Sequence, residues 1–177
     1  GMIEQDSTYI KNAWMEIVSV LPSIQIEDTL YHNGEGEIFL AYNYDIEKPS
    51  GRASGDCRTI YNVRSVSTSF DLYANGADIG HSALTSFSIE DDLDIEAEMT
   101  ASVSVETIHY RNQREEYQYY IGGEIYYRDR CRYSHNEYST DTLTISDTID
   151  LEYYNSEPSY SLEILDEAYG SYSGSLE

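Results

Sequence analysis

The chain has 177 residues, enough for one domain with a sizeable core, and its 33 acidic against 10 basic side chains give a formal charge of −23. Such a charge repels phosphate backbones and anionic lipid headgroups, so we expect no nucleic-acid partner and no membrane insertion. The plentiful and periodic aromatic and β-branched residues exclude the disorder that a high net charge often indicates.

The composition also indicates where in or outside the cell the protein is located. The chain has 19 tyrosines but three phenylalanines and one tryptophan, and Lys11 and Lys48 are its lysines. With abundant Ser and Thr, this is typical of an extracellular or envelope-exposed β-rich protein, because Tyr packs its ring on strand surfaces while its hydroxyl stays hydrated. The cytoplasm of a halophile is the alternative, since such proteins share the acid excess and the scarcity of Lys. We find no signal peptide and interpret Gly1 before Met2 as an expression scar.

The first elements lie before residue 57. We expect residues 1–8 to be a disordered or scar-containing terminus. Residues 9–21 carry apolar side chains at helical spacing, but their β-branched residues favour a strand, with a helix as the alternative. Asn33-Gly34 predicts a hairpin turn between strands over 24–32 and 37–46, and the Pro and Gly residues of 45–56 predict a loop.

The middle of the chain holds its clearest pattern. Residues 57–66 and 67–74 have strand character, and Asn75-Gly76 predicts a hairpin into residues 78–89. From Asp92 to Val105 polar and apolar residues then alternate almost without error. Because successive side chains of a strand point to opposite faces, this predicts a long strand with one buried and one acidic face. Its apolar row is Leu93, Ile95, Ala97, Met99, Ala101, Val103 and Val105.

The remaining elements complete the fold prediction. We expect a polar tip over 111–116, a return over 117–133 with a bulge or bend at Gly122-Gly123, and an alternating strand over 142–154. A weak strand over 160–165 and a polar tail or linker over 166–177 follow. The pattern predicts an all-β fold, an antiparallel β-sandwich of the Ig-like or jelly-roll-like kind, with 9–165 as a single domain. A barrel is the second choice.

The two cysteines of the chain are Cys57 and Cys131. Strand parity places each on the inward side of its strand, so we predict a disulfide that joins one sheet to the other. In the entropic account, closing a loop of about 75 residues stabilises the fold by roughly 4 kcal/mol. Two buried thiols in a reducing cytosol are the alternative.

Three arginines share the outward face of their predicted strand. Folding a hairpin about Gln113 brings each of them opposite an acidic side chain. The predicted pairs are Glu98–Arg128, Glu96–Arg130 and Asp94–Arg132. Each cross-strand pair would contribute roughly 0.2–1 kcal/mol, and an anion site is the less favoured alternative.

Calcium is the metal that this chain suits best, because Ca²⁺ takes oxygen ligands and carboxylates are plentiful. The candidates stand at a strand entrance and on the apolar side of a later strand: Glu90, Asp91, Asp92 and Asp147. Their spacing matches no calcium-loop motif, so solvated acidic faces are the alternative, and we expect no other cofactor. The four histidines form no ligand or nucleophile motif, which leaves no candidate catalytic residue.

Tyrosine is the remaining functional signal, since 13 of the 19 lie from Tyr110 onward. We predict a binding surface at Tyr119, Tyr120 and Tyr126, with a glycan or a protein as partner. The chain is then a non-catalytic structural or adhesive recognition module, alone or as part of a larger surface protein. A polysaccharide hydrolase with paired carboxylates is the alternative, because that chemistry is defined by separation in space.

Overall fold

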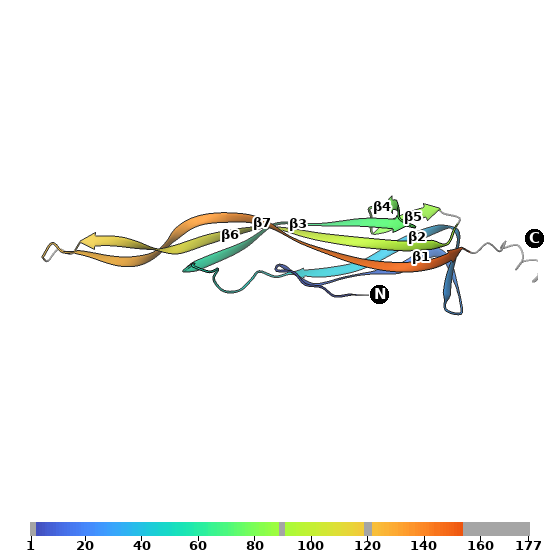
Figure 1. Cartoon of the computed structure of the whole chain (residues 1–177), viewed down its shortest axis with the longest axis horizontal. Coiled ribbons are helices and arrows are strands. Elements are labelled where there is room, and N and C mark those ends of the chain that lie inside the picture. The colour runs from blue at the N-terminus through green and yellow to red at the C-terminus, as the bar shows by residue number, and fades with distance from the viewer. Residues whose placement is uncertain (1–2, 89–90, 119–121, 154–177) are drawn as a thin grey trace, which may run out of the picture.

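The computed structural model describes residues 3–88, 91–118 and 122–153, and in these ranges the fold is all-β, as predicted (Figure 1). The strands are β1 (Ile10–Ile26), β2 (Thr29–Ile46), β3 (Arg58–Ala74), β4 (Ala77–Gly80), β5 (Leu84–Ser88), β6 (Leu93–Gln118) and β7 (Ile125–Tyr153). Strands β1, β2 and β5 form one antiparallel sheet, and β3, β4, β6 and β7 form the other. The result is a β-sandwich that does not close into a barrel.

No helix in the described part of the chain is long and apolar enough to cross a membrane.

The core lies between the two sheets, and the alternating strand supplies its centre. Every residue of the predicted apolar row from Leu93 to Val105 is at most 2 % exposed. The first sheet covers this row with Ile10, Ala13, Met15, Ile17, Ile38 and Leu40. Burial of one such aliphatic side chain stabilises a fold by roughly 1.5–3 kcal/mol, so this row fixes which face of β6 points inward.

The first hairpin differs from its prediction. Residues 10–21 are strand, as favoured, but β2 continues through Asn33-Gly34, and the turn is instead at residues 27–28, between Ile26 and Thr29. Residues 33–36 form a long bulge. Ser23 pairs with His32 and Leu21 pairs with Glu37, so these four residues lie opposite Pro22. Proline has no N–H to donate to the strand ladder, and Glu35 and Gly36 pair with β5 instead.

The second predicted hairpin is confirmed at its turn, but its return strand is shorter than the predicted 78–89: β4 ends at Gly80, and Leu84–Ser88 forms β5, which pairs with β2. Ala74 pairs with Ala77 across Asn75-Gly76, and both turn residues have positive φ, 50° and 81°. These are the angles of a type I′ turn, which suits the twist of two-residue hairpins and favours Asn-Gly. Strand β3 is continuous over the two segments predicted before it, with a register shift at Arg64.

Asp141 of β7 binds the segment that precedes β1. Asp141 Oδ2 accepts hydrogen bonds from Ser7 Oγ at 2.6 Å and from the Tyr9 backbone N–H at 2.7 Å. Residues 3–8, expected to be disordered or a scar, therefore lie ordered beside β1, where Gln5 also forms an antiparallel bridge with Ala13. At the far end, β2 and β7 meet in a short parallel contact of Tyr31 with Glu152 and His32 with Tyr153.

The hairpin of β6 and β7 is much longer than predicted, and the polar tip over 111–116 is wrong. These residues belong to β6, which pairs with β7 as far as Gln118 and Ile125. The three predicted pairs about Gln113 are also wrong, since Glu98 lies opposite Ser146, Glu96 opposite Thr148 and Asp94 opposite Asp150. The register that forms places Ile145 and Leu151 in the core, each 1 % exposed. Their burial outweighs exposed ion pairs worth a fraction of a kcal/mol each.

Candidate functional site

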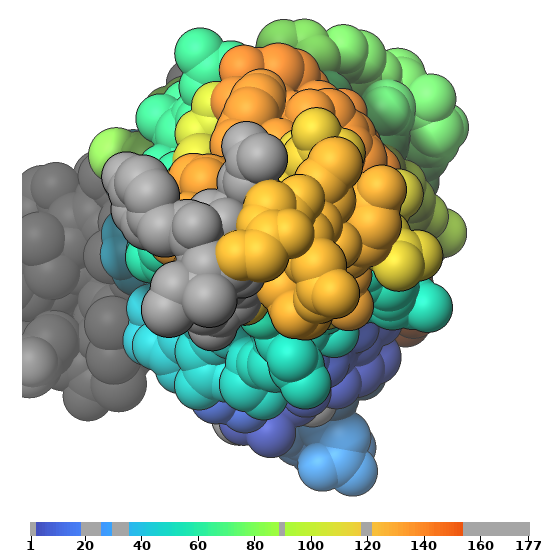
Figure 2. All heavy atoms as spheres, turned by 90° about the vertical axis from the view of Figure 1, so that its left-hand side faces the viewer, coloured from blue at the N-terminus to red at the C-terminus, as the bar shows by residue number. Residues whose placement is uncertain are grey.

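Beyond the sandwich, β6 and β7 continue as a two-stranded ribbon, which we call the arm and define as residues 111–118 and 125–133. Figure 1 shows the arm extending from one end of the sandwich, while β7 ends at Tyr153 at the opposite end. Viewed from its tip along the long axis, the arm stands in front of the other strands as yellow and orange atoms (Figure 2). Every described residue of the β7 half is exposed, so both faces of the ribbon meet solvent.

One face of the arm is rich in arginine. Directly opposed residues of an antiparallel pair share a face, and the opposed pairs here are Arg111–Arg132, Gln113–Arg130, Glu115–Arg128 and Tyr117–Tyr126. We call these eight residues the arginine face. It carries four arginines and one acidic residue, Glu115, which pairs with Arg132 at 2.7 Å and with Arg130 at 3.8 Å. The bond from Arg132 and the nearby arginine charges hold the pKa of Glu115 below its ordinary value.

Tyrosine rings lie among these cations. The Arg128 guanidinium lies 4.9 Å from the centre of the Tyr117 ring, which is 6.2 Å from the Tyr126 ring. Tyr126 is 42 % exposed, and its hydroxyl donates to Glu124. On the opposite face Arg114 lies 4.4 Å from the Tyr127 ring. Such contacts hold large aromatic rings in place at the surface at modest entropic cost.

The arm also differs from the rest of the chain in charge. Residues 111–133 contain five arginines and four acidic residues, a net charge of +1, so the remaining residues carry −24. Half of all basic side chains therefore lie in this one hairpin. The arm is therefore close to neutral, whereas the rest of the chain is strongly acidic.

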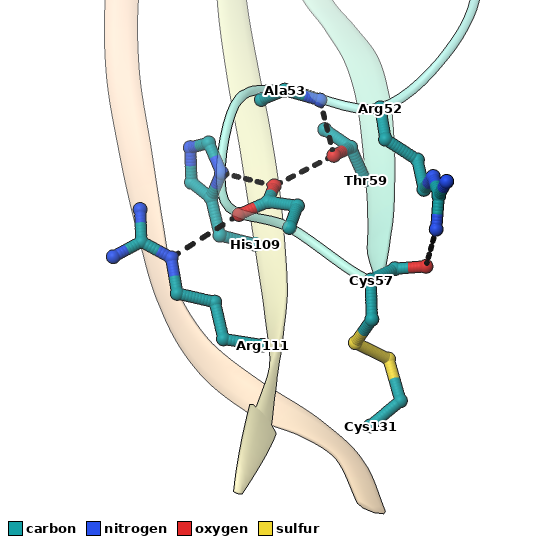
Figure 3. Close-up of a disulfide and its surroundings, with 8 residues drawn as sticks. Arg52, Ala53, Cys57, Thr59, His109, Arg111 and Cys131 are labelled. Atoms are coloured by element: carbon teal, nitrogen blue, oxygen red, sulfur yellow. Dashed lines mark hydrogen bonds and ion pairs between the residues drawn. A yellow bond between two sulfur atoms is a disulfide. The ribbon is translucent and has the colours of Figure 1, made fainter.

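A disulfide joins the base of the arm to the sandwich. Cys57 and Cys131 are bonded, with their Cα atoms 5.9 Å apart, which confirms the predicted pairing (Figure 3). The expected inward, sheet-to-sheet location is wrong. Cys131 is exposed, Cys57 is half-buried just before β3, and both adjoin the same sheet. Close to Cys131, β7 has one extra residue at Ser134, a bulge of the kind that increases the local twist of a strand.

A buried carboxylate lies beside this disulfide. Asp56 accepts hydrogen bonds from Thr59 Oγ1 at 2.6 Å, His109 Nδ1 at 2.5 Å and Arg111 Nε at 3.2 Å (Figure 3). Burial alone would raise the pKa of Asp56, but the three hydrogen bonds outweigh it and lower the pKa to about 2. The carboxylate thus stays charged and ties the loop before β3 to the first residue of the arm. Sequence patterns did not single out Asp56, since one acid among 33 carries no signal.

The predicted binding residues have different outcomes. Tyr126 lies on the arginine face of the arm, exposed as expected, whereas Tyr119 and Tyr120 lie outside the described residues. Among the predicted calcium ligands that the structure describes, Asp92 and Asp147 lie in different places. Asp92 accepts the Tyr153 N–H at 2.7 Å, and Asp147 is buried and accepts the Ile17 N–H at 2.9 Å. Six residues of one strand, about 20 Å, separate those two places on β7. Asp91 lies beside Asp92, and Glu90 is outside the described residues.

A shallow hollow of about 210 Å³ lies on the second sheet, away from the arm tip. Its lining residues are Arg64, Ser104, Val105, Tyr138, Ser139 and Thr140, with no carboxylate among them. A polysaccharide hydrolase requires two carboxyl groups about 5–10 Å apart across a groove. This hollow does not match that arrangement.

Comparison with known proteins yields one match. Residues 3–154 match the N-terminal domain of DUF8186, a domain of unknown function. The chain belongs to this family. Neither a curated protein nor a solved structure matches. The match to DUF8186 covers all seven strands, so the arm and its base lie within the family domain.

Proposed function

We propose that this DUF8186 domain is a non-catalytic recognition module of an extracellular or envelope-exposed protein, and that the arm is its contact surface. The observation that carries the proposal is the arginine face, where Tyr117 and Tyr126 share one face of a solvent-exposed ribbon with four arginines. Tyr and Arg are enriched among the residues that dominate binding energy at interfaces. The disulfide supports the extracellular setting, because such bonds persist in oxidising compartments.

The partner that fits this surface best is an acidic protein surface. The planar guanidinium groups can bind carboxylates with two hydrogen bonds, and the rings add apolar contact area. Arg111 and Arg132 are already engaged by Asp56 and Glu115, which places them rigidly for such a contact. A glycan would use the tyrosine rings but would gain less from the arginines.

The test compares arm variants with matched variants on the sandwich. Arg64 lies 5.1 Å from the ring of Tyr138, which is 60 % exposed, so this pair repeats the Arg–Tyr chemistry outside the arm. The chain is screened against arrays of extracellular proteins and of glycans. For hits, Tyr126→Ala and Arg128→Ala should each weaken binding about 10-fold, while Tyr138→Ala and Arg64→Ala leave it unchanged. Binding to an acidic protein should also weaken as salt increases.

Two outcomes would contradict the proposal in different ways. If the arm variants and the sandwich variants lose affinity equally, the contact surface is not the arm. If the chain binds neutral glycans and Arg128→Ala leaves that affinity unchanged, the partner is a glycan and not an acidic protein. Circular dichroism of each variant checks that the fold is retained.

A further inference from the structure

Two histidines and a glutamate meet where the arm joins the sandwich. His109 lies on β6 directly opposite His135 on β7, and their rings stack with centroids 4.6 Å apart and planes 21° apart. Glu137 follows two residues after His135 on the same face of β7. Its Oε1 lies 3.4 Å from the Nε2 atom of each histidine. The three possible ligand atoms lie within 4.8 Å of one another.

The hydrogen bonds of His109 leave one particular nitrogen available. Its Nδ1 lies 2.5 Å from the carboxylate of Asp56, which accepts hydrogen bonds, so the proton of a neutral imidazole lies on Nδ1. The lone pair is then on Nε2. The His109 side chain is 6 % exposed, and its Nε2 is buried without a hydrogen-bond partner among the described residues. A buried polar atom of this kind needs an explanation, and coordination of a metal ion would supply one.

The second histidine is arranged in a similar way. His135 Nδ1 lies 2.9 Å from the hydroxyl of Ser134, the extra residue of the bulge, while its Nε2 faces Glu137. Both Nε2 atoms therefore lie 3.4 Å from the same carboxylate oxygen. The bulge contributes directly, because without it His135 would not lie opposite His109.

We propose that His109, His135 and Glu137 form a site for a divalent transition metal of the Zn²⁺ class, with Asp56 as the residue that positions His109. Two imidazoles and one carboxylate are a common zinc ligand set that leaves one coordination position open. Zinc–ligand bonds of about 2.0–2.1 Å at tetrahedral angles place neighbouring ligand atoms about 3.4 Å apart. Glu137 Oε1 lies at this separation, 3.4 Å, from both Nε2 atoms.

The surroundings have the features of a supported metal site. Histidine ligands usually donate their other N–H to a carboxylate or carbonyl, which fixes the ring and its tautomer. Asp56 has this role for His109 and is itself held by Thr59 and Arg111. The ligands range from buried His109 through half-buried His135 to exposed Glu137, so an ion can enter from the solvent side. Bound metal would link β6 to β7 beside the disulfide and stiffen the base of the arm.

The experiment measures Zn²⁺ binding to the purified full chain after removal of metals with a chelator. Isothermal titration calorimetry should show one tight site, and Zn²⁺ should raise the thermal unfolding midpoint. Excess Ca²⁺ is present throughout to occupy exposed carboxylates, because imidazole ligands prefer Zn²⁺ and oxygen ligands prefer Ca²⁺. Co²⁺ substitution should give the visible absorption of tetrahedral coordination.

Variants of the accessible ligands avoid disturbing the buried one. His135→Ala and Glu137→Gln keep the His109–Asp56 bond, and each should lower Zn²⁺ affinity by more than about 10-fold. His81→Ala and Glu152→Gln alter exposed residues of the same types elsewhere and should leave affinity unchanged. NMR of the imidazole nitrogens should show Zn²⁺ shifting Nε2 of His109 and His135.

Three results would overturn the proposal. These are no binding in the presence of Ca²⁺, equal affinity in the ligand and control variants, or bound Zn²⁺ that leaves both imidazoles unshifted. Each outcome is independent of whether the arm binds a partner.

Discussion

The backbone N–H of Ile17 donates a hydrogen bond of 2.9 Å to Oδ2 of Asp147, and so joins β1 of one sheet to β7 of the other. Both residues are buried, at 8 % and 7 % exposure. Asp147 stands on the apolar side of its strand, where a carboxylate is costly unless it is hydrogen-bonded. Asp147 therefore helps to hold the two sheets together through this hydrogen bond, in addition to the apolar side chains that pack around it.

Replacement of Asp147 by Ala should destabilise the fold by roughly 1–3 kcal/mol, because the buried N–H of Ile17 loses its acceptor. Chemical denaturation of the variant should show the loss as a lower midpoint. Ser146→Ala, at an exposed neighbouring position, is the control and should change stability little. An unchanged midpoint for Asp147→Ala would mean that water or a neighbouring group replaces the carboxylate.

The hydrophobic pattern was sufficient to predict the sandwich but not the register of its longest hairpin. The apolar row from Leu93 to Val105 is buried as predicted, because one buried face fixes the parity of a strand. Parity does not fix how far the partner strand is shifted. Arg128 meets Glu98 in one register and Glu115 in another, and only packing of Ile145 and Leu151 in three dimensions decides between them.

The residues at the base of the arm could not be predicted for a related reason. His109 and His135 are 26 positions apart and become neighbours only through the long register and the bulge at Ser134. Asp56 joins them from a loop that sequence reasoning recognised by its Pro and Gly residues alone. The cysteines were predictable because a chain with two has one intramolecular pairing.

The disulfide should contribute substantially to stability. Its partners are separated by 74 residues, and the entropic account gives about 4 kcal/mol for a loop of that size. The Cys57→Ser/Cys131→Ser double variant should therefore unfold at a clearly lower denaturant concentration than the oxidised chain. Thiol titration of denatured, unreduced protein should find no free thiol. Two titratable thiols in protein isolated without reductant would contradict both the bond and the extracellular proposal.

His81 provides a pH-dependent contribution near neutrality. Its Nδ1 lies 2.9 Å from Asp71 and its Nε2 lies 3.1 Å from Asp78. The hydrogen bond to Asp71, the charge of Asp78 and the Phe70 carbonyl raise the pKa of His81 above its ordinary 6.5. Because the folded pKa is the higher one, the stabilisation is fully present below pH 6.5 and is lost as the pH rises through the folded value.

An NMR titration of the imidazole measures this effect directly. His81 should titrate above 6.5, and Asp71→Asn should move its pKa back toward that value. Asp150→Asn, an exposed acid on another strand, should not move it. A His81 pKa that Asp71→Asn leaves unchanged would show that the ring does not bind Asp71 in solution.

Gly36 and Phe87 form a cross-strand pair in which the ring covers the glycine. They are directly opposed on β2 and β5, and a Cβ added at Gly36 would lie 2.8 Å from Cε1 of the Phe87 ring. Glycine is required here because the aromatic ring packs on its backbone, an arrangement that protects an otherwise weak strand position. Gly36→Ala should therefore destabilise the fold by roughly 1–3 kcal/mol through overpacking, measured by urea denaturation.

A double-mutant cycle separates this close contact from any other effect of the added methyl group. Phe87→Ala removes the ring, which is 8 % exposed, and should be destabilising by itself. In that background Gly36→Ala has room for its Cβ and should cost nothing, or stabilise slightly by lowering the entropy of the unfolded chain. The coupling energy between the two positions should then be about 1–3 kcal/mol. Additive losses would show that the alanine at position 36 acts on the bulge of β2 and not through the Phe87 ring.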